Sequence, residues 1–233
     1  MQPNIAVVNN SGNVGKSTIC ETLLQPRLKN SEIIKVETIN SDGSDDVKFS
    51  AKEYDQILKK IDLSECAIID VGSSNIEGFV LKMSEYKDSH EDIDFFIIPT
   101  IPQHKQQVDA ASTASNLLSM GIEQDRIKFI FNQVDKSMDL KRQFNVLLEE
   151  LNVLDFKLNN YPIIYDTSVF SELNKSETTF NDVVNDNRDF RTLLRQAETQ
   201  AEKETLSDER TIKRLVSGVN DVLDVAFENL GII

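Results

Sequence analysis

The amino-acid sequence predicts an α/β fold in three layers, with a mostly parallel sheet between two layers of helices and a helical C-terminal extension. Short apolar segments alternate with longer segments of helical periodicity, which is typical of βαβ units. A glycine-containing loop that ends in Lys-Ser-Thr follows the first apolar segment, and a later one, residues 66–70, ends in aspartate. At 233 residues the chain has the length of one large domain. We therefore expect one domain over 1–233, with an α/β core over 1–170 and the helical extension over 171–233.

Each expected strand is a short run of mainly aliphatic and β-branched residues, and each expected helix repeats apolar residues three to four positions apart. In chain order, the strands are expected at 4–8, 33–37, 66–70, 93–98, 127–131 and 162–165. The helices are expected at 17–28, 53–61, 106–120, 139–151, 189–203 and 211–230, with a short break containing Ser-Asp-Glu between the last two. Ligands bind at the carboxyl ends of the strands in such sheets, so we expect the functional site there.

The composition is that of a globular protein, with 39% hydrophobic and 27% charged residues. It excludes a disordered, collagenous or membrane-spanning chain. The only two cysteines, Cys20 and Cys66, lie in apolar patterns and are too few for a disulfide framework. Because the first thirty residues lack the pattern of a secretory signal, we expect reduced, buried thiols and a cytoplasmic location.

The net charge of −14 disfavours direct contact with DNA, since the mean field of the protein repels the phosphates. Arg188, Arg191 and Arg195 recur at helical spacing and form a small basic stripe. Acidic residues are interleaved with the basic residues that follow, so a solvated face of paired charges is favoured over a DNA contact. A DNA-binding role would therefore need a local basic patch or a basic partner.

The last expected helix, 211–230, carries its apolar residues on one face, so we expect it to pack on the core. Its polar face is acidic at Asp221, Asp224 and Glu228, which is the wrong sign for anionic lipid. No segment approaches the roughly 18 consecutive apolar residues of a membrane span. We therefore expect no membrane contact. The apolar residues of this face are Ile212, Leu215, Val216, Val219, Val222, Leu223, Ala226 and Leu230.

The loop after the first strand, NNSGNVGKST, has the pattern of a phosphate-binding P-loop between a strand and a helix. Asn10 stands where the pattern has its first glycine, and asparagine tolerates a positive φ. Glycines and the start of a helix turn backbone amides toward phosphate. We expect Lys16 to reach the β- and γ-phosphates, Ser17 to bind Mg²⁺ and Thr18 to contact the α-phosphate. The alternative is a tight turn without a ligand. The candidate nucleotide-binding residues here are Ser11, Gly12, Asn13, Val14, Gly15, Lys16, Ser17 and Thr18.

Asp70 ends the apolar segment 66–70, and in P-loop proteins an acid in this place holds Mg²⁺ through water. The alternative is an aspartate that caps a loop. Together with Ser17 it predicts the metal site, and with Lys16 it completes the catalytic core of the candidate site.

Asn132 and Asp135 follow the strand expected at 127–131. An asparagine amide offers a donor and an acceptor to the edge of a purine. The segment resembles a guanine-reading Asn-Lys-x-Asp element, but Gln133 stands in the lysine position and Ser73 replaces the glycine of the matching Asp-x-x-Gly element. Adenine is therefore favoured and a GTP-binding protein remains the alternative; for Asp135 an ordinary turn is equally compatible.

On these motifs the sequence resembles the ParA/MinD-like family of P-loop ATPases with a deviant Walker A loop, and within it the StbB-type plasmid-stability proteins. The resemblance covers residues 1 to about 170 in element order. It implies a P-loop NTPase fold, hydrolysis of ATP with Mg²⁺, bound ATP or ADP, and a nucleotide-dependent homodimer. It also implies a function in plasmid stability or DNA segregation with a plasmid-encoded DNA-binding adaptor protein.

The sequence departs from this family at Ser11, where the family carries a lysine that reaches the phosphates of the other subunit. A nucleotide-gated binding module with negligible hydrolysis is therefore the first alternative. Glu37 matches the first acid of the family's switch motif, and it and Asp42 are our candidates to orient the attacking water; for Asp42 a solvated turn is the alternative. A dethiobiotin-synthetase-like enzyme is the remaining alternative, although the acidic loop 37–46 disfavours an acidic substrate.

Overall fold

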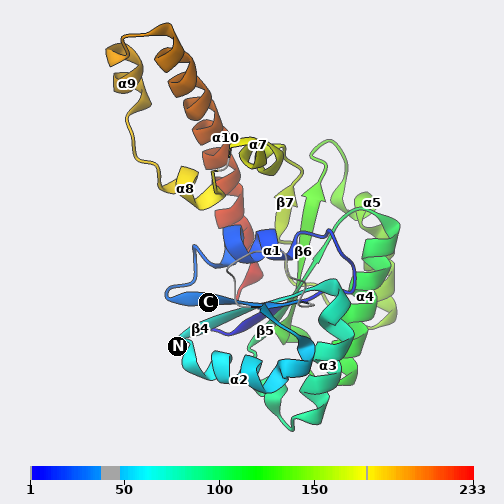
Figure 1. Ribbon diagram of the computed structural model, residues 1–233. Helices are drawn as coiled ribbons and strands as arrows, with labels where there is room; N and C mark the ends of the chain where they lie inside the picture. Colours follow the sequence, from blue (N-terminus) through cyan, green and yellow to red (C-terminus); the bar gives the residue numbers. More distant parts are fainter. Residues whose placement is uncertain (1, 38–47, 177) are drawn as a thin grey trace.

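A seven-stranded sheet with the order β3-β2-β4-β1-β5-β6-β7 forms the centre of the computed structural model (Figure 1), which describes residues 2–37, 48–176 and 178–233. Each recorded strand pairing is parallel. The predicted fold class is confirmed, and each of the six predicted strands overlaps an observed one. The strands are β1 Ile5–Val7, β2 Ser31–Val36, β3 Lys48–Phe49, β4 Cys66–Val71, β5 Phe95–Thr100, β6 Ile127–Val134 and β7 Ile163–Tyr165.

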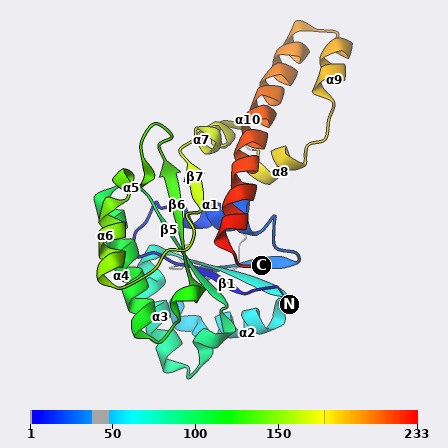
Figure 2. The same cartoon turned by 180° about the vertical axis from the view of Figure 1, so that it is seen from behind.

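Helices cover both faces of the sheet (Figures 1 and 2) because successive strand residues point to opposite sides. Ala6, Ile69 and Phe96 pack toward one layer, whereas Val7 and Ile68 pack toward the other. The first layer contains α2 Tyr54–Leu63, α3 Ile76–Glu85, α4 His104–Ser119, α5 Leu140–Gln143 and α6 Asn145–Val153. The second contains α1 Lys16–Ile19, its continuation as the π-helix η1 Cys20–Leu24, α7 Val169–Ser176, α8 Phe180–Asn185 and α10 Gln200–Leu230. Short 3-10 helices complete the chain: η2 Ala51–Glu53, η3 Ser73–Asn75, η4 Ser89–Asp92 and η5 Gln124–Arg126.

The C-terminal helices differ from the prediction. α9 (Phe190–Gln196) is short, and α10 runs without interruption through the Ser-Asp-Glu segment at 207–209, so the predicted break there is wrong. The break lies at 197–199, where a capping box starts α10: the Thr199 hydroxyl accepts from the amide of Glu202, and the Glu202 carboxylate accepts from the amide of Thr199. α9 and the first half of α10 extend away from the sheet (Figure 1).

The second half of α10 packs on the sheet, as predicted, through the buried side chains of Val216, Leu223 and Ala226. Leu215 was expected on the same face but is 40% exposed, because the packed stripe is narrower than the apolar pattern. Arg27 fastens this half to the end of η1, with its guanidinium 2.7 Å from the carboxylate of Asp224. Among the described residues, no helix combines the length and apolarity needed to cross a bilayer.

Both cysteines are buried, as predicted. Burial raises the pKa of Cys20 well above its ordinary value and that of Cys66 to about 11. Thiols with such pKa values carry little thiolate at neutral pH, so neither cysteine has the character of a nucleophile.

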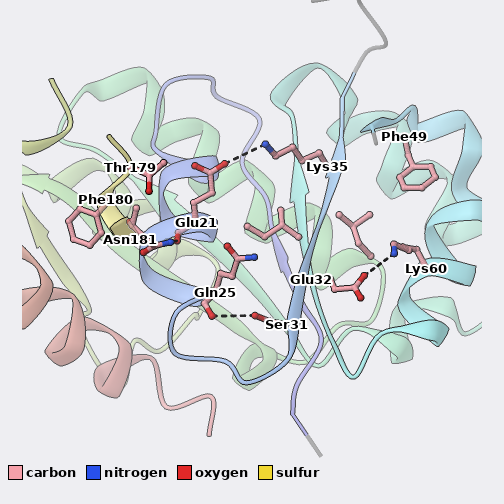
Figure 3. Close-up of a pocket in the computed structure, with 13 residues that line it drawn as sticks. Glu21, Gln25, Ser31, Glu32, Lys35, Phe49, Lys60, Thr179, Phe180 and Asn181 are labelled. Atoms are coloured by element: carbon pink, nitrogen blue, oxygen red, sulfur yellow. Dashed lines mark hydrogen bonds and ion pairs between the residues drawn. The ribbon is translucent and has the colours of Figure 1, made fainter. Parts of the chain in front are cut away.

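An open groove of about 690 Å³ lies beside the edge strand β3 and its neighbour β2, and is lined partly by β2, η1 and α8 (Figure 3). Its charged side chains pair with one another. The Lys35 ammonium lies 3.4 Å from the Glu21 carboxylate, and the Lys60 ammonium lies 2.8 Å from that of Glu32. These pairs join β2 to η1 and α2, so we assign the groove a structural role.

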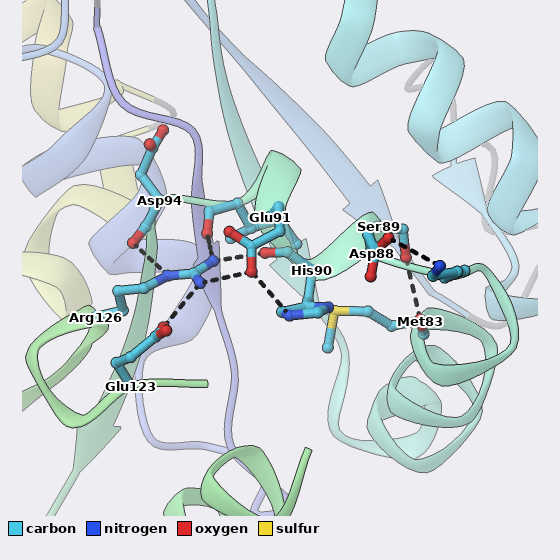
Figure 4. Close-up of polar contacts among 10 residues, drawn as sticks. Met83, Asp88, Ser89, His90, Glu91, Asp94, Glu123 and Arg126 are labelled. Carbon is cyan, nitrogen blue, oxygen red and sulfur yellow. Dashed lines mark hydrogen bonds and ion pairs between the residues drawn. The ribbon is translucent and has the colours of Figure 1, made fainter. Parts of the chain in front are cut away.

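The guanidinium of Arg126 lies at the amino ends of β5 and β6 and holds the loops before these two strands together (Figure 4). It donates to the carbonyls of His90 and Ile93 at 2.6 Å each and lies 3.1 Å from the Glu123 carboxylate. The side chain of Arg126 is only 16% exposed. It also donates to the carbonyl of Asp94 at 3.4 Å, so removing it would leave three carbonyls without this donor.

We therefore expect Arg126→Ala to lower the free energy of unfolding by about 2 kcal/mol, measured by urea denaturation. The control is Lys82→Ala, which removes an exposed ion pair with Glu85 and should cost less than about 0.5 kcal/mol. Equal losses in the two variants would contradict the structural role of Arg126.

Candidate functional site

The loop between β1 and α1 and the end of β4 meet at the carboxyl edge of the sheet, because β1 and β4 pair in parallel with Val7 opposite Asp70. Two loop residues have a positive φ, Asn13 at 58° and Gly15 at 91°. Asn10, which stands at the first glycine position of the pattern, does not adopt a positive φ; Asn13 does, two residues before Gly15. A Cβ atom on Gly15 would lie 2.5 Å from the Asn132 amide nitrogen, so this position requires glycine.

Lys16 directly follows the loop as the first residue of α1 and is 8% exposed. Its ammonium donates to the carbonyl of Asn9 at 3.1 Å and to that of Ser11 at 2.8 Å. Burial lowers the pKa of Lys16, and the nearby Asp70 carboxylate opposes this change. The loop therefore holds a largely buried cation between its own carbonyls.

Asp70 is 3% exposed at the end of β4. Burial raises the pKa of Asp70, whereas a hydrogen bond from Ser17 and the charge of Lys16 lower it. The Ser17 hydroxyl and the Asp70 carboxylate thus form an adjacent pair of oxygen donors, the ligand type that Mg²⁺ prefers. Within the described part of the chain, no group of three or more His, Cys, Asp or Glu side chains is suited to hold a metal. The pair fits Mg²⁺ that completes its coordination with phosphate and water.

A pocket of about 600 Å³ opens around these residues, a volume suited to a small-molecule ligand. It brings together most of the predicted site: Gly12, Asn13, Gly15, Lys16, Ser17, Thr18, Glu37 and Asn132. Three predicted residues do not line it and lie behind its wall: Ser11 is 1% exposed, Asp70 is 3% exposed and Val14 is fully buried. The pocket is also lined by residues that sequence reasoning missed: Gly72, Ser73, Tyr165, Asp166, Thr167, Phe170 and Leu223.

These missed residues belong to or follow four elements, β4, β7, α7 and α10. Gly72 and Ser73 directly follow β4, and Tyr165 to Thr167 follow or end β7, so the rule that ligands bind at strand carboxyl ends contained the signal for both. Phe170 and Leu223 come from α7 and α10. Their place in the pocket depends on helix packing that no local pattern encodes.

The structure separates the two residues expected at the base: Asn132 lines the pocket and Asp135 does not. The Asn132 side chain donates to the carbonyl of Val14 at 3.0 Å and accepts from the amide of Gln133 at 2.9 Å, so it supports the loop. Asp135 lines a neighbouring hollow and accepts from the amide and hydroxyl of Ser137 at 2.8 and 2.7 Å. These hydrogen bonds lower the pKa of Asp135.

Of the two acids expected to orient water, the structure describes Glu37 but not Asp42. Glu37 lines the pocket directly after β2, and its carboxylate lies 3.3 Å from the ammonium of Lys48. Asp42 falls outside the residues that the structure describes.

No protein-family model matches the sequence, and no curated protein matches it significantly. Among solved structures, the MinD cell division protein of Aquifex aeolicus matches with a TM-score of 0.52 and 14% identity over 92% of this chain and 97% of that one. The septum site-determining protein MinD of Pyrococcus horikoshii, complexed with Mg-ADP, matches with a TM-score of 0.52 and 13% identity over 97% and 99%. A McdA variant of Cyanothece in complex with ATP matches with a TM-score of 0.51 and 13% identity over 96% of each chain. The chain therefore has the fold of the MinD/ParA-type P-loop ATPases.

Proposed function

We propose that this protein is a ParA-like ATPase that binds ATP with Mg²⁺ and acts in plasmid stability or DNA segregation with a DNA-binding partner protein. The observation that carries the proposal is that Lys16 and Ser17 line one pocket at the carboxyl edge of the sheet, where the buried Asp70 accepts a hydrogen bond from Ser17. The ligands of similar folds support an adenine nucleotide, since one MinD was solved with Mg-ADP and a McdA variant with ATP.

In this proposal the loop binds the phosphates. The amides from Gly12 to Thr18 surround the start of α1, where a helix leaves its first amides without internal partners. The Lys16 ammonium has three donor hydrogens, and its bonds to the carbonyls of Asn9 and Ser11 use two of them, so it can add a phosphate oxygen as a third acceptor. Because charged acceptors make stronger hydrogen bonds than neutral ones, this added bond favours the bound state.

Ser17 and Asp70 hold Mg²⁺ in this proposal, Asp70 through water. When bound, Mg²⁺ neutralises charge on the phosphates during transfer. Glu37 orients the attacking water from the adjoining wall of the pocket. Asp42 stays a second candidate for that role. Asn132 acts by fixing the loop through Val14, and Asp135 has no contact with the pocket that would support base recognition.

A second candidate function, a nucleotide-gated binding module with negligible turnover, is favoured by Ser11. Its side chain is buried and hydrogen bonded to Asp109, so it extends toward α4 and not out of the loop. Such a side chain supplies no cation to a second subunit. Both candidates bind nucleotide, and only the rate of phosphate release separates them.

The partner is proposed to make the DNA contact. Arg188 of the basic stripe is engaged by the carboxylates of Asp186 and Glu209, at 2.7 and 3.0 Å. This pairing supports the interpretation of the stripe as a solvated face of paired charges. A nucleotide-dependent homodimer and a cytoplasmic location complete the proposal.

Calorimetric titration in the presence of Mg²⁺ tests nucleotide binding. We expect ATP to bind more tightly than GTP, and Lys16→Ala to weaken ATP binding roughly 10- to 100-fold through the loss of charged hydrogen bonds. Lys59→Ala is the matched control, because Lys59 is exposed on α2 and should bind ATP like the wild type. Light scattering on the same samples reports whether ATP doubles the mass. Binding of neither nucleotide would refute the proposal, and tighter binding of GTP would refute the choice of ATP.

Asp70→Asn tests two effects of the buried carboxylate, one on the stability of the protein and one on Mg²⁺-dependent binding of ATP. Because burial raises the pKa of Asp70 above its unfolded value, its contribution to stability is complete below the unfolded pKa and is lost as the pH rises through the folded pKa. The neutral, isosteric variant should therefore be more stable than the wild type at neutral pH. This advantage should shrink as the pH falls toward the unfolded pKa, as measured by urea denaturation.

The same variant should lose the Mg²⁺ dependence of ATP binding, as measured by titration with and without the metal. A variant that is less stable at neutral pH, or that keeps the full Mg²⁺ effect, would contradict the assignment of Asp70.

Single-turnover release of phosphate distinguishes the two candidate functions. If Glu37 orients the water, Glu37→Gln should slow release at least about 10-fold while ATP binding stays within about threefold, because general-base or water-orienting groups act on the chemical step. No measurable release from the wild type, with ATP bound, would instead establish the gated module.

A further inference from the structure

Helix α4 holds the first half of the phosphate-binding loop, to which it is adjacent in the fold (Figure 1). The hydroxyl of Ser11 donates to the carboxylate of Asp109, and the amide of Asn10 donates to the hydroxyl of Thr113 at 3.2 Å. Asp109 and Thr113 are four residues apart, so they lie on one face of α4. The Thr113 hydroxyl also donates to the carbonyl of Asp109 at 2.7 Å, which fixes its orientation.

Ser11 connects Asp109 of α4 with Asn9 and Lys16. Its amide donates to the side chain of Asn9 at 2.7 Å, and its carbonyl accepts from the ammonium of Lys16 at 2.8 Å. Asn9 is itself fixed, since its side chain donates to the carbonyl of Pro99 at the end of β5. With the amide and hydroxyl both bonded, the orientation of the Ser11 carbonyl is determined by its neighbours.

We propose that Asp109 is a positioning residue for nucleotide binding, acting through Ser11 on the place of the Lys16 ammonium. This inference rests on the proposed function. A carboxylate is a stronger acceptor than a neutral oxygen, so Asp109 holds Ser11 more firmly than a serine or an amide would. A loop fixed before the ligand arrives loses less conformational entropy on binding, and this difference appears as affinity.

Lys105 provides a control, because it pairs with the same carboxylate. Its ammonium lies 3.6 Å from the carboxylate of Asp109, and its side chain is 78% exposed. Such a solvent-exposed pair contributes little. Lys105→Ala therefore removes a charge next to Asp109 and leaves the contact with Ser11 in place.

The experiment is a double-mutant cycle on ATP affinity with Ser11→Ala, Asp109→Ala and the double variant, measured by calorimetry alongside thermal unfolding. We expect each single variant to lose about 10-fold in affinity and the double variant to lose no more than the worse single one, because both remove the same bond. Asp109→Asn, which keeps an acceptor oxygen, should recover affinity to within about threefold of the wild type. Lys105→Ala should stay within about twofold.

The outcomes separate this inference from the proposed function. Wild-type protein that fails to bind ATP would overturn the proposed function and this inference with it. Wild-type binding with unchanged affinity in the single variants, even if their melting temperatures fall, would overturn the inference alone, since the bond would then be merely structural. Additive losses in the double variant would overturn it too, because Ser11 and Asp109 would then act separately.

Discussion

The parallel pairing of β1 with β4 is the constraint on which the candidate site depends. Its register sets Val7 opposite Asp70, so the loop that follows β1 and the acid that ends β4 come to one edge of the sheet. A largely buried ammonium and a buried carboxylate then lie close enough to influence each other's pKa. Burial disfavours both charges, and their mutual attraction offsets part of that cost. The pair therefore couples the stability of this edge to its chemistry.

The rest of the molecule supports this edge from two sides. On one side, α4 fixes the start of the loop through Asp109 and Thr113. On the other, the second half of α10 packs beneath η1, and Arg27 ties the two together. Asn132 adds a third contact, since its side-chain amide donates to the carbonyl of Val14 in the loop. The loop is thus held by elements distant in sequence, which is how a segment with two positive φ angles keeps one conformation.

The sequence predicted the features that local chemistry determines. The order of strand, loop and helix, the glycine at 15 and the acid at 70 all follow from short patterns. The structure places Gly15 in the pocket and Asp70 next to Ser17. The contact of Ser11 with Asp109 spans 98 positions and leaves no local signature. The start of α10 did leave one, the Thr199–Glu202 capping box, but the polar segment 207–209 suggested the break instead. Polar residues are tolerated within an exposed helix, and a cap is the stronger signal.

Hydrogen–deuterium exchange with and without Mg-ATP tests the central claim most directly, because it reports where on the chain a ligand binds. The account predicts slower exchange at the loop amides of residues 12–18 and at the turn 165–167 on the opposite wall of the pocket. It predicts little change at the groove beside β2, whose charges already pair with one another. Unchanged exchange at the loop under saturating Mg-ATP, or protection confined to that groove, would contradict it.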